Sequence, residues 1–368
     1  MKGAIRFLDL RVTDAAEKAE LLAACENVLD HGRIVLGPEV EEFERAVAKR
    51  IGKRHAIGVG SGSDAVYLGL RALGIGPGDE VITGSLSWVA TANGIALTGA
   101  TPVFADIGDD LNVDPASVRR LISSDTRAVL AVHYTGRPCE MVELMKICRQ
   151  HRLLLVEDAA QAFGARYQGR PVGSFGDAAC FSMNPMKVLA SLGEAGIVAT
   201  DGDDVADKVR SLRYNGTINR EECVQPSING RLDTLQAAFL LVRMKRFEAV
   251  VNRRREIAAF YRQALQGVVD TPDERPGDFS VYYTFTIQAD DRDGLRRHLE
   301  DHHGIECKIQ HPILMPDQPA YREKTRVECG NARRLRDRIL CIPAHEKMSD
   351  EQTSRVAEAI RAYYRRGA

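Results

Sequence analysis

An aspartate and a lysine, 29 residues apart, are the residues of this chain best suited to catalysis. Asp158 ends the apolar run that starts at Leu153, and Lys187 follows in the loop Cys180-Phe-Ser-Met-Asn-Pro-Met-Lys187. An acid at a strand end and a lysine in a nearby tight loop can form a pyridoxal phosphate site, in which the lysine makes a Schiff base and the aspartate keeps the pyridine nitrogen protonated. Taken alone the pair is a weak signal, because most lysines are solvated surface charges.

Short apolar runs alternate with helical patterns between about residue 55 and residue 201. Strands are expected over 55–59, 80–83, 102–107, 128–132, 153–156, 179–182 and 196–200, and helices over 64–73, 90–97 and 141–151. This alternation predicts an α/β fold with a mostly parallel sheet covered by helices on both faces. Ligands of such sheets bind beyond the carboxyl ends of the strands. Asp158, Ser182 and the turn after Val59 all lie at such ends.

The C-terminal part has a different pattern. A long helix is expected over about 234–265, followed by strands over 282–287 and 305–309 and by helices near 293–302, 330–340 and 350–365. A chain of 368 residues suits one large domain and one smaller domain. We therefore expect a large domain over 1–240, which includes the N-terminal segment, and a smaller α+β domain over 241–368 entered through the long helix.

Composition excludes several classes of protein. Fifty basic and fifty-one acidic residues leave a net charge of −1, which favours neither nucleic acid nor a membrane surface as a partner. The N-terminus lacks the apolar core of a signal peptide, and no stretch is long enough to span a bilayer, so a cytoplasmic location is expected. The eight cysteines form no Cys-x-x-Cys pair and are expected to be small buried hydrophobes.

One histidine pair has the spacing of metal ligands. His298 and His302 would share a helix face, but no glutamate follows the first histidine and no third ligand is evident. A solvated helix end is the expected interpretation, and no metal is predicted.

A phosphate site is the first candidate near the strand ends. Gly62 and Ser63 lie in the turn before a predicted helix, where glycine lets backbone amides approach a phosphate and the helix N-terminus adds partial positive charge. Ser182 could add a hydroxyl to the same phosphate. An ordinary serine-glycine helix cap uses the same residues and is the competing explanation.

Four further residues have both a functional and a structural explanation. Trp88, the only tryptophan, could stack on a flat ring or fill the core. Gln161 could reach a ring oxygen or cap its loop, and Asn215 before Gly216 could be a plain turn. Glu194 lies between glycines and is more readily structural than catalytic.

In chain order, these segments resemble the DegT/DnrJ/StrS aminotransferases, sugar-modifying members of the aspartate aminotransferase superfamily of fold type I. The resemblance runs from about residue 5 to residue 365. The matching segments are Gly60–Ala65, Leu73–Ile82, Ala100–Asp106, Val156–Ala162, Gly176–Ser182, Lys187, Gly193–Gly196 and Asn229–Ala238.

The resemblance implies a role for each candidate. Lys187 is expected to form the internal aldimine with pyridoxal 5'-phosphate and to shuttle the proton, and Asp158 to pair with the pyridinium nitrogen. Gln161 would contact the ring hydroxyl and Trp88 would stack on the ring, while Ser182, Gly62 and Ser63 would bind the phosphate. Asn215 would reach the phosphate of the neighbouring subunit's cofactor, which implies a homodimer with shared active sites.

The resemblance also implies the reaction. The family transfers an amino group from L-glutamate, or sometimes glutamine, to a keto-sugar that is usually nucleotide-linked, at a 3-keto or 4-keto position. A related dehydratase replaces the lysine with histidine, so Lys187 favours transamination over a dehydratase that uses pyridoxal or pyridoxamine phosphate. A sensor without turnover is a further alternative, which the intact lysine and aspartate oppose.

Three positions depart from the family's usual pattern. Ala195 stands in the usual Gly-Glu-Gly-Gly, and Met183 follows the serine where an aromatic residue or a histidine is frequent. Pro316 occupies a usual histidine position, so the resemblance does not extend to a sugar contact there. Nearby His311 could contact the substrate instead, or could be a loop histidine without that role.

Overall fold

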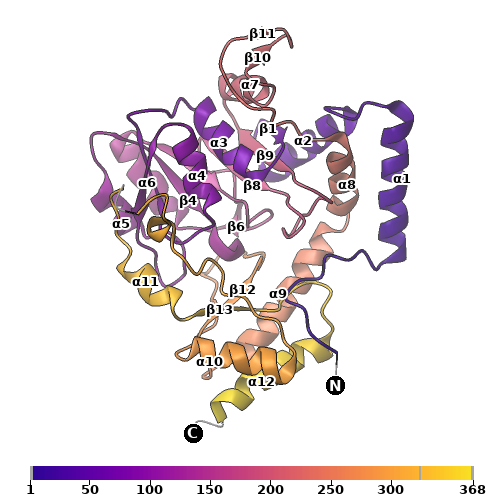
Figure 1. The fold of residues 1–368 in the computed structure, drawn as a ribbon, viewed down its shortest axis with the longest axis vertical. Helices are drawn as coiled ribbons and strands as arrows, with labels where there is room; N and C mark the ends of the chain where they lie inside the picture. Colours follow the sequence, from indigo (N-terminus) through magenta and orange to yellow (C-terminus); the bar gives the residue numbers. More distant parts are fainter. Residues whose placement is uncertain (1–2, 323–324, 366–368) are drawn as a thin grey trace.

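The chain is described by a computed structural model over residues 3–322 and 325–365, and its centre is a seven-stranded sheet (Figure 1). The sheet has the strand order β1-β9-β8-β5-β4-β2-β3. Its strands are β1 (His55–Val59), β2 (Glu80–Gly84), β3 (Thr101–Ala105), β4 (Thr126–Val132), β5 (Leu154–Asp158), β8 (Ala178–Ser182) and β9 (Gly196–Thr200). All seven predicted strands are thus confirmed, with ends that shift by at most two residues.

Strand directions determine which side chains meet at one edge. Strands β3, β2, β4, β5 and β8 run parallel, and only β9 runs antiparallel to its neighbours β8 and β1. Because β1 is antiparallel to β9, it points the same way as β8. The carboxyl ends of β1, β5 and β8 therefore lie on the same edge, as the sequence predicted for a mostly parallel sheet.

Helices cover both faces of the sheet, which explains the nearly continuous apolar strands. One face packs against α3 (Gly62–Ala72) and α7 (Asp203–Leu212) through side chains such as Val156 and Val198. On the other face, α2 (Pro38–Ile51) and α8 (Thr234–Met244) pack on one part of the sheet, and α5 (Pro115–Leu121) and α6 (Met141–His151) on another. The other helices of this part are α1 (Ala15–His31), which packs on α8, and α4 (Ala90–Leu97), which packs on α3.

The C-terminal part, drawn in the lower half of Figure 1, has an apolar cluster of its own. Its elements are α9 (Phe247–Ala264), β12 (Phe285–Gln288), α10 (Arg292–Arg297), α11 (Gly330–Arg336), β13 (Ile339–Ile342) and α12 (Asp350–Arg365), and β12 pairs antiparallel with β13. Helix α11 packs outside this cluster, on residues of the large part such as Leu86 and Tyr134. Ile5 is buried in this cluster and bridges to Ile305, although the N-terminal segment was assigned to the large domain. The boundary at residues 240 and 241 stays a prediction.

Several C-terminal predictions need correction. The helix expected over 234–265 is two helices, since Lys245 and Arg246 donate their amides to carbonyls three residues earlier and tighten the chain at that point. No glycine or proline marks this break. The run 305–309 forms isolated bridges instead of a strand, and Tyr282, at φ 48°, delays the start of β12 until Phe285. The helix expected over 330–340 ends at Arg336, and residues 339 and 340 belong to β13 instead.

The expected solvated helix end holds for His302, which is exposed, but not for His298. His298 is buried, and its ring lies against those of His302 and Tyr363 in the five-residue π-helical segment His298–His302. Over residues 3–322 and 325–365, no group of three histidine, cysteine or acidic side chains is arranged to hold a metal. Over the same residues, no helix is both long and apolar enough to cross a membrane.

Candidate active site

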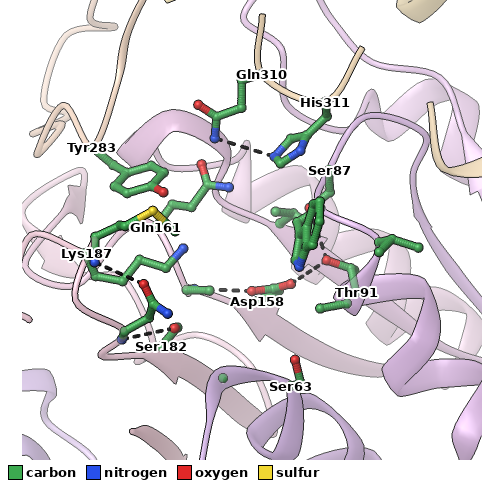
Figure 2. Close-up of a pocket in the computed structure, with 18 of the residues that line it drawn as sticks. Ser63, Ser87, Thr91, Asp158, Gln161, Ser182, Lys187, Tyr283, Gln310 and His311 are labelled. Atoms are coloured by element: carbon green, nitrogen blue, oxygen red, sulfur yellow. Dashed lines mark hydrogen bonds between the residues drawn. The ribbon is translucent and has the colours of Figure 1, made fainter. Parts of the chain in front are cut away.

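A cavity of about 710 Å³ opens at the carboxyl ends of β5 and β8. It brings together seven of the eight predicted site residues: Gly62, Ser63, Trp88, Asp158, Gln161, Ser182 and Lys187. Two walls face each other across it. We call the wall of Gly62, Ser63, Asp158, Ser182 and Lys187 the strand-end half, and the wall of Tyr283, Lys308, Gln310, His311 and Gln318 the loop half. Figure 2 labels Asp158 and Lys187 of the first half and Gln310 and His311 of the second.

Asp158 is held at the end of β5 with its carboxylate toward the cavity (Figure 2). Thr91, at the start of α4, donates its hydroxyl to Oδ2 at 2.7 Å, and the amide of Ala160 donates to Oδ1 at 3.2 Å. Burial raises the pKa of this carboxyl above its usual value, against the effect of these two hydrogen bonds. A cation placed beside Asp158 would favour the ionised carboxylate, so the site fits a protonated ring nitrogen.

Glu157, the neighbour of Asp158, fixes this strand end through hydrogen bonds of its buried carboxylate. Its carboxylate is fully buried and accepts the amides of Gly173, Phe175 and Gly176 at 2.7–2.8 Å. His133 completes the set at 3.1 Å. Because Nδ1 of His133 accepts the amide of Cys139, Nε2 carries the proton and donates to Glu157. Burial alone would raise the pKa of Glu157, but these donors outweigh it and leave the pKa below its usual value.

Lys187 lies in the loop after β8 and reaches into the same cavity (Figure 2). Its Nζ is 4.5 Å from the centroid of the Tyr283 ring. Burial lowers the pKa of Lys187 to about 8, although Asp158 and Glu194 act in the opposite direction. A neutral amine is the nucleophilic form, so this surrounding prepares Lys187 to react with an aldehyde near neutral pH.

The start of α3 forms one end of the strand-end half. Ser61 is its N-cap and accepts the amide of Asp64 at 3.0 Å, while the first helical amides, those of Gly62 and Ser63, have no acceptor within the helix. A Cβ on Gly62 would lie 2.5 Å from that of Ser182, so only glycine lets this turn approach the end of β8. Free amides, a helix N-terminus and a serine hydroxyl together suit a phosphate.

Trp88 and Gln161 complete the walls of the cavity. Trp88 is 60% exposed, which is incompatible with a core tryptophan and leaves its ring available for stacking. Gln161 accepts the amide of Thr135 at 2.8 Å through Oε1, so its amide nitrogen remains as the donor group.

Asn215 is the one predicted site residue that does not line the cavity of its own chain. It adopts a left-handed conformation (φ 59°), and its amide bonds to the carbonyl of Ile228. It precedes the small hairpin of β10 (Thr217–Ile218) and β11 (Glu222–Cys223), which projects from the body at the top of Figure 1. A role for Asn215 within its own site is therefore not supported.

Sequence reasoning missed Thr91, Tyr283, Lys308, Gln310 and Gln318, all of which line the cavity. One of them carried a usable signal, since Thr91 is a polar residue in an otherwise mainly apolar helix. Among the ambiguous residues, Glu194 and His311 also line the cavity, whereas Pro316 is buried outside its lining. Glu194 accepts from the side-chain amide of Asn184 at 2.6 Å.

His311 lies on the loop half as a neutral imidazole. Burial is the main reason that its pKa is lowered to about 3, and the nearby ammonium groups of Lys187 and Lys308 act in the same direction. Its ring lies 5.7 Å from the rings of both Trp88 and Tyr134. The backbone of His311 is left-handed (φ 57°), and the bond from Gln310 to its ring is long, at 3.5 Å.

The sheet order and this cavity define an α/β enzyme. In its site, a lysine amine and a buried aspartate lie beside a helix N-terminus that is suited to bind a phosphate. Comparison with known proteins identifies it further. The chain belongs to the DegT/DnrJ/EryC1/StrS aminotransferase family, whose model matches residues 15–361, and the family resemblance noted in the sequence is confirmed.

Individual relatives agree with this assignment. The dTDP-3-amino-3,4,6-trideoxy-alpha-D-glucose transaminase of Streptomyces venezuelae is 38% identical over 98% of this chain and 97% of its own length. The UDP-N-acetyl-3-dehydro-alpha-D-glucosamine 3-aminotransferase of Acidithiobacillus ferrooxidans is 36% identical, with 97% of each chain covered. A crystal structure of S. venezuelae DesV in complex with a ketimine intermediate has a TM-score of 0.94, at 38% identity and with 98% and 99% of the two chains covered.

Proposed function

We propose that this chain is a cytoplasmic, pyridoxal phosphate-dependent enzyme that transfers an amino group from L-glutamate to a nucleotide-linked 3-keto or 4-keto sugar. The observation that carries the proposal is the shared cavity of Lys187 and Asp158 in a chain of this family. The names of two relatives support the sugar, since both place the new nitrogen on carbon 3 of a nucleotide-linked sugar. A 3-keto substrate is therefore the first to test.

When bound, pyridoxal phosphate supplies an electron-accepting ring that stabilises negative charge on the substrate carbon bearing the amine. Lys187 holds the cofactor and moves the proton at that carbon, since its amine is the only basic nitrogen of the strand-end half. Asp158, fixed by Thr91, keeps the ring nitrogen protonated. Trp88 stacks on the ring, Gln161 donates to the ring hydroxyl, and the remaining residues of the strand-end half, Gly62, Ser63 and Ser182, bind the phosphate.

The test is a panel of nucleotide-linked 3-keto and 4-keto sugars, each offered with L-glutamate or L-glutamine to the cofactor-loaded enzyme. The expected product is an amino sugar that carries nitrogen from isotopically labelled glutamate, together with 2-oxoglutarate, as measured by mass spectrometry. A product that loses water and gains no nitrogen would instead identify a dehydratase. Cofactor binding without turnover of any sugar would favour the sensor alternative.

We also propose that the active unit is a homodimer in which Asn215 serves the partner's cofactor site. Asn215 lies outside its own cavity, and exposed apolar side chains gather around its hairpin: Ile218, Val224 and Ile228. The test combines a Lys187→Ala chain with an Asn215→Ala chain that is itself impaired. If the site is shared, each heterodimer has one intact site and one doubly damaged site, so activity returns. Verified heterodimers without activity would remove Asn215 from the partner's site.

A further inference from the structure

The loop half of the cavity carries a lysine that the proposed reaction has not yet used. Lys308 lines the cavity and is exposed to solvent. Its backbone is fixed by two hydrogen bonds to Cys341 of β13, at 3.0 and 2.8 Å. The position of Lys308 is thus set by the backbone, and its side chain is left available.

Neither acid of the cavity lining neutralises this lysine. Among the residues that the structure describes, the lining includes two carboxylates, those of Asp158 and Glu194. Asp158 accepts from Thr91 and Ala160, and Glu194 accepts from Asn184. Across residues 3–322 and 325–365, no carboxylate oxygen lies within 4.0 Å of the Lys308 ammonium group as an ion-pair partner. A cation that lines a substrate cavity and has no protein counter-ion is suited to bind an anionic group of a ligand.

The other side chains of the loop half cannot supply that positive charge. Gln310, Gln318 and Tyr283 are neutral, and His311 is neutral because burial lowers its pKa to about 3. The charge of Lys308 nevertheless reaches across the cavity. Burial is the main reason that the pKa values of Lys187 and His311 are lowered, and the charge of Lys308 acts in the same direction on both. Once Lys187 has bound the cofactor, Lys308 is the remaining lysine ammonium group among the described residues that line the cavity.

We propose that Lys308 binds a carboxylate carried by a substrate and thereby determines which substrate the loop half accepts. The inference rests on the proposed function, because it assigns the cavity to an amine donor and a keto-sugar. Two sources fit the same chemistry. One is a carboxylate of the amino donor glutamate, and the other is a carboxylate on the sugar itself, as in a nucleotide-linked uronic acid.

The expected effect follows from the strength of a charge-assisted hydrogen bond. Removing the ammonium group while keeping the length of the side chain, as in Lys308→Met, should weaken binding of the carboxylate by roughly 10- to 100-fold. Lys308→Arg keeps the charge and should retain most of the binding. Lys146→Met removes one charge from the exposed face of α6, away from the cavity, and serves as the control. Melting temperatures of all variants confirm that the fold is retained.

The experiment separates the two half-reactions of the cofactor-loaded enzyme. In the first, the cofactor spectrum is followed as L-glutamate is added, and calorimetry measures binding of sodium glutarate. In the second, the aminated enzyme is mixed with a nucleotide-linked 3-keto sugar that has no carboxylate, or with its 3-keto uronate counterpart. The concentration that gives half the maximal rate is measured for each substrate and each variant.

The outcomes assign the source. If Lys308→Met raises the half-saturating glutamate concentration and weakens glutarate binding, while the half-saturating concentrations of both sugars stay unchanged, Lys308 binds the donor. If only the uronate sugar is affected, Lys308 binds the sugar acid. The proposal is wrong if the half-saturating concentrations of glutamate and uronate and the affinity for glutarate in Lys308→Met match those of the parent within about twofold. It is also wrong if the half-saturating concentration of the sugar without a carboxylate rises as much as those of the carboxylate substrates.

Failure of the proposed function gives a different result. The parent enzyme would then transfer nitrogen to none of the sugars. Binding of glutarate and of a nucleotide-linked hexuronate, measured by calorimetry on parent and Lys308→Met, still decides whether this lysine binds a carboxylate. Equal binding of both ligands to the two proteins would overturn the inference.

Discussion

The two halves of the cavity are built in different ways. In the strand-end half, Asp158, Ser182 and the start of α3 are positioned by the sheet, and short hydrogen bonds fix the aspartate. In the loop half, His311 has a left-handed backbone, and its ring receives a long bond of 3.5 Å. A non-glycine residue in such a conformation costs about 1–3 kcal/mol, which the surrounding structure must offset.

This difference suggests a division of labour. A half that is fixed by regular structure suits the steps common to every substrate, whereas a half on loops can vary with the sugar. Changes in the strand-end half should therefore lower the rate with every substrate. Changes in the loop half should act on the KM of particular substrates. The following variants test this division, beginning with the largest expected effect.

Lys187→Ala should abolish amino transfer, with a loss of about 10⁴-fold or more, because the variant lacks the amine that holds the cofactor and moves the proton. The loss should be equal for all accepted sugars, as measured by steady-state assays. Borohydride treatment of the parent should fix the cofactor covalently on the peptide that contains Lys187. Mapping of the adduct to another lysine would contradict the assignment.

Asp158→Asn should leave the fold intact and lower the rate by about 10²- to 10³-fold, since a neutral amide cannot hold the ring nitrogen protonated. Rates with several sugars and the melting temperature of the variant check both statements. Thr91→Val, which removes one donor to Asp158, should cause a smaller loss of the same kind. An Asp158→Asn variant as fast as the parent would refute the role given to this residue.

Glu157→Gln should destabilise the strand-end half, because an amide NH₂ would face backbone donors and His133 in a fully buried site. The expected loss in the free energy of unfolding is about 3 kcal/mol. The pKa of Glu157 is lower in the folded chain than in the unfolded chain. The ionised carboxylate therefore stabilises the fold at any pH above the unfolded-state pKa, and this stabilisation is lost as the pH falls through the folded-state pKa. Denaturation curves at pH 7 and below pH 4 should thus show the difference from the parent narrowing in acid.

Reconstitution of the cofactor-free chain should depend on pH through Lys187. Its pKa is lowered to about 8, so the neutral amine increases as the pH rises through this value. The rate of pyridoxal phosphate incorporation, followed by visible absorbance, should rise about tenfold from pH 7 to pH 9 and then level off. A rate still rising steeply toward pH 10.5, the ordinary lysine value, would show that burial does not tune this amine.

His311→Asn should have the smallest effect, with a KM for the keto-sugar raised by about three- to tenfold, as expected for one neutral hydrogen bond. The glutamate half-reaction should remain unchanged, as stopped-flow spectra can test. Because the pKa of His311 is about 3, the effect should be the same at every pH from 5 to 8. An equal loss in both half-reactions would break the proposed division between the halves.

The same division explains how far the sequence could be interpreted. The strands that end at Val59, Asp158 and Ser182 were predictable because apolar runs, glycines and caps mark them locally. The loop half was not. Lys308 is held by backbone bonds to Cys341 of β13, 33 residues later, and Tyr283 directly precedes β12, which pairs with the same strand. No local pattern specifies these long-range contacts. The break between α8 and α9 is local, made by the bonds of the Lys245 and Arg246 amides to carbonyls three residues earlier, but no glycine or proline marks it in the sequence.

Trp88 gives the cavity a built-in optical reporter. It is the only tryptophan of the chain, and it is 60% exposed on the cavity wall. Excitation of indole therefore reports on one place in the whole molecule, and a chromophore bound beside it would quench the emission by energy transfer. Tyrosine emission from elsewhere can be avoided by exciting at the red edge of the indole band. Cofactor loading, donor binding and sugar binding can thus be followed by fluorescence in the unmodified protein, without any label.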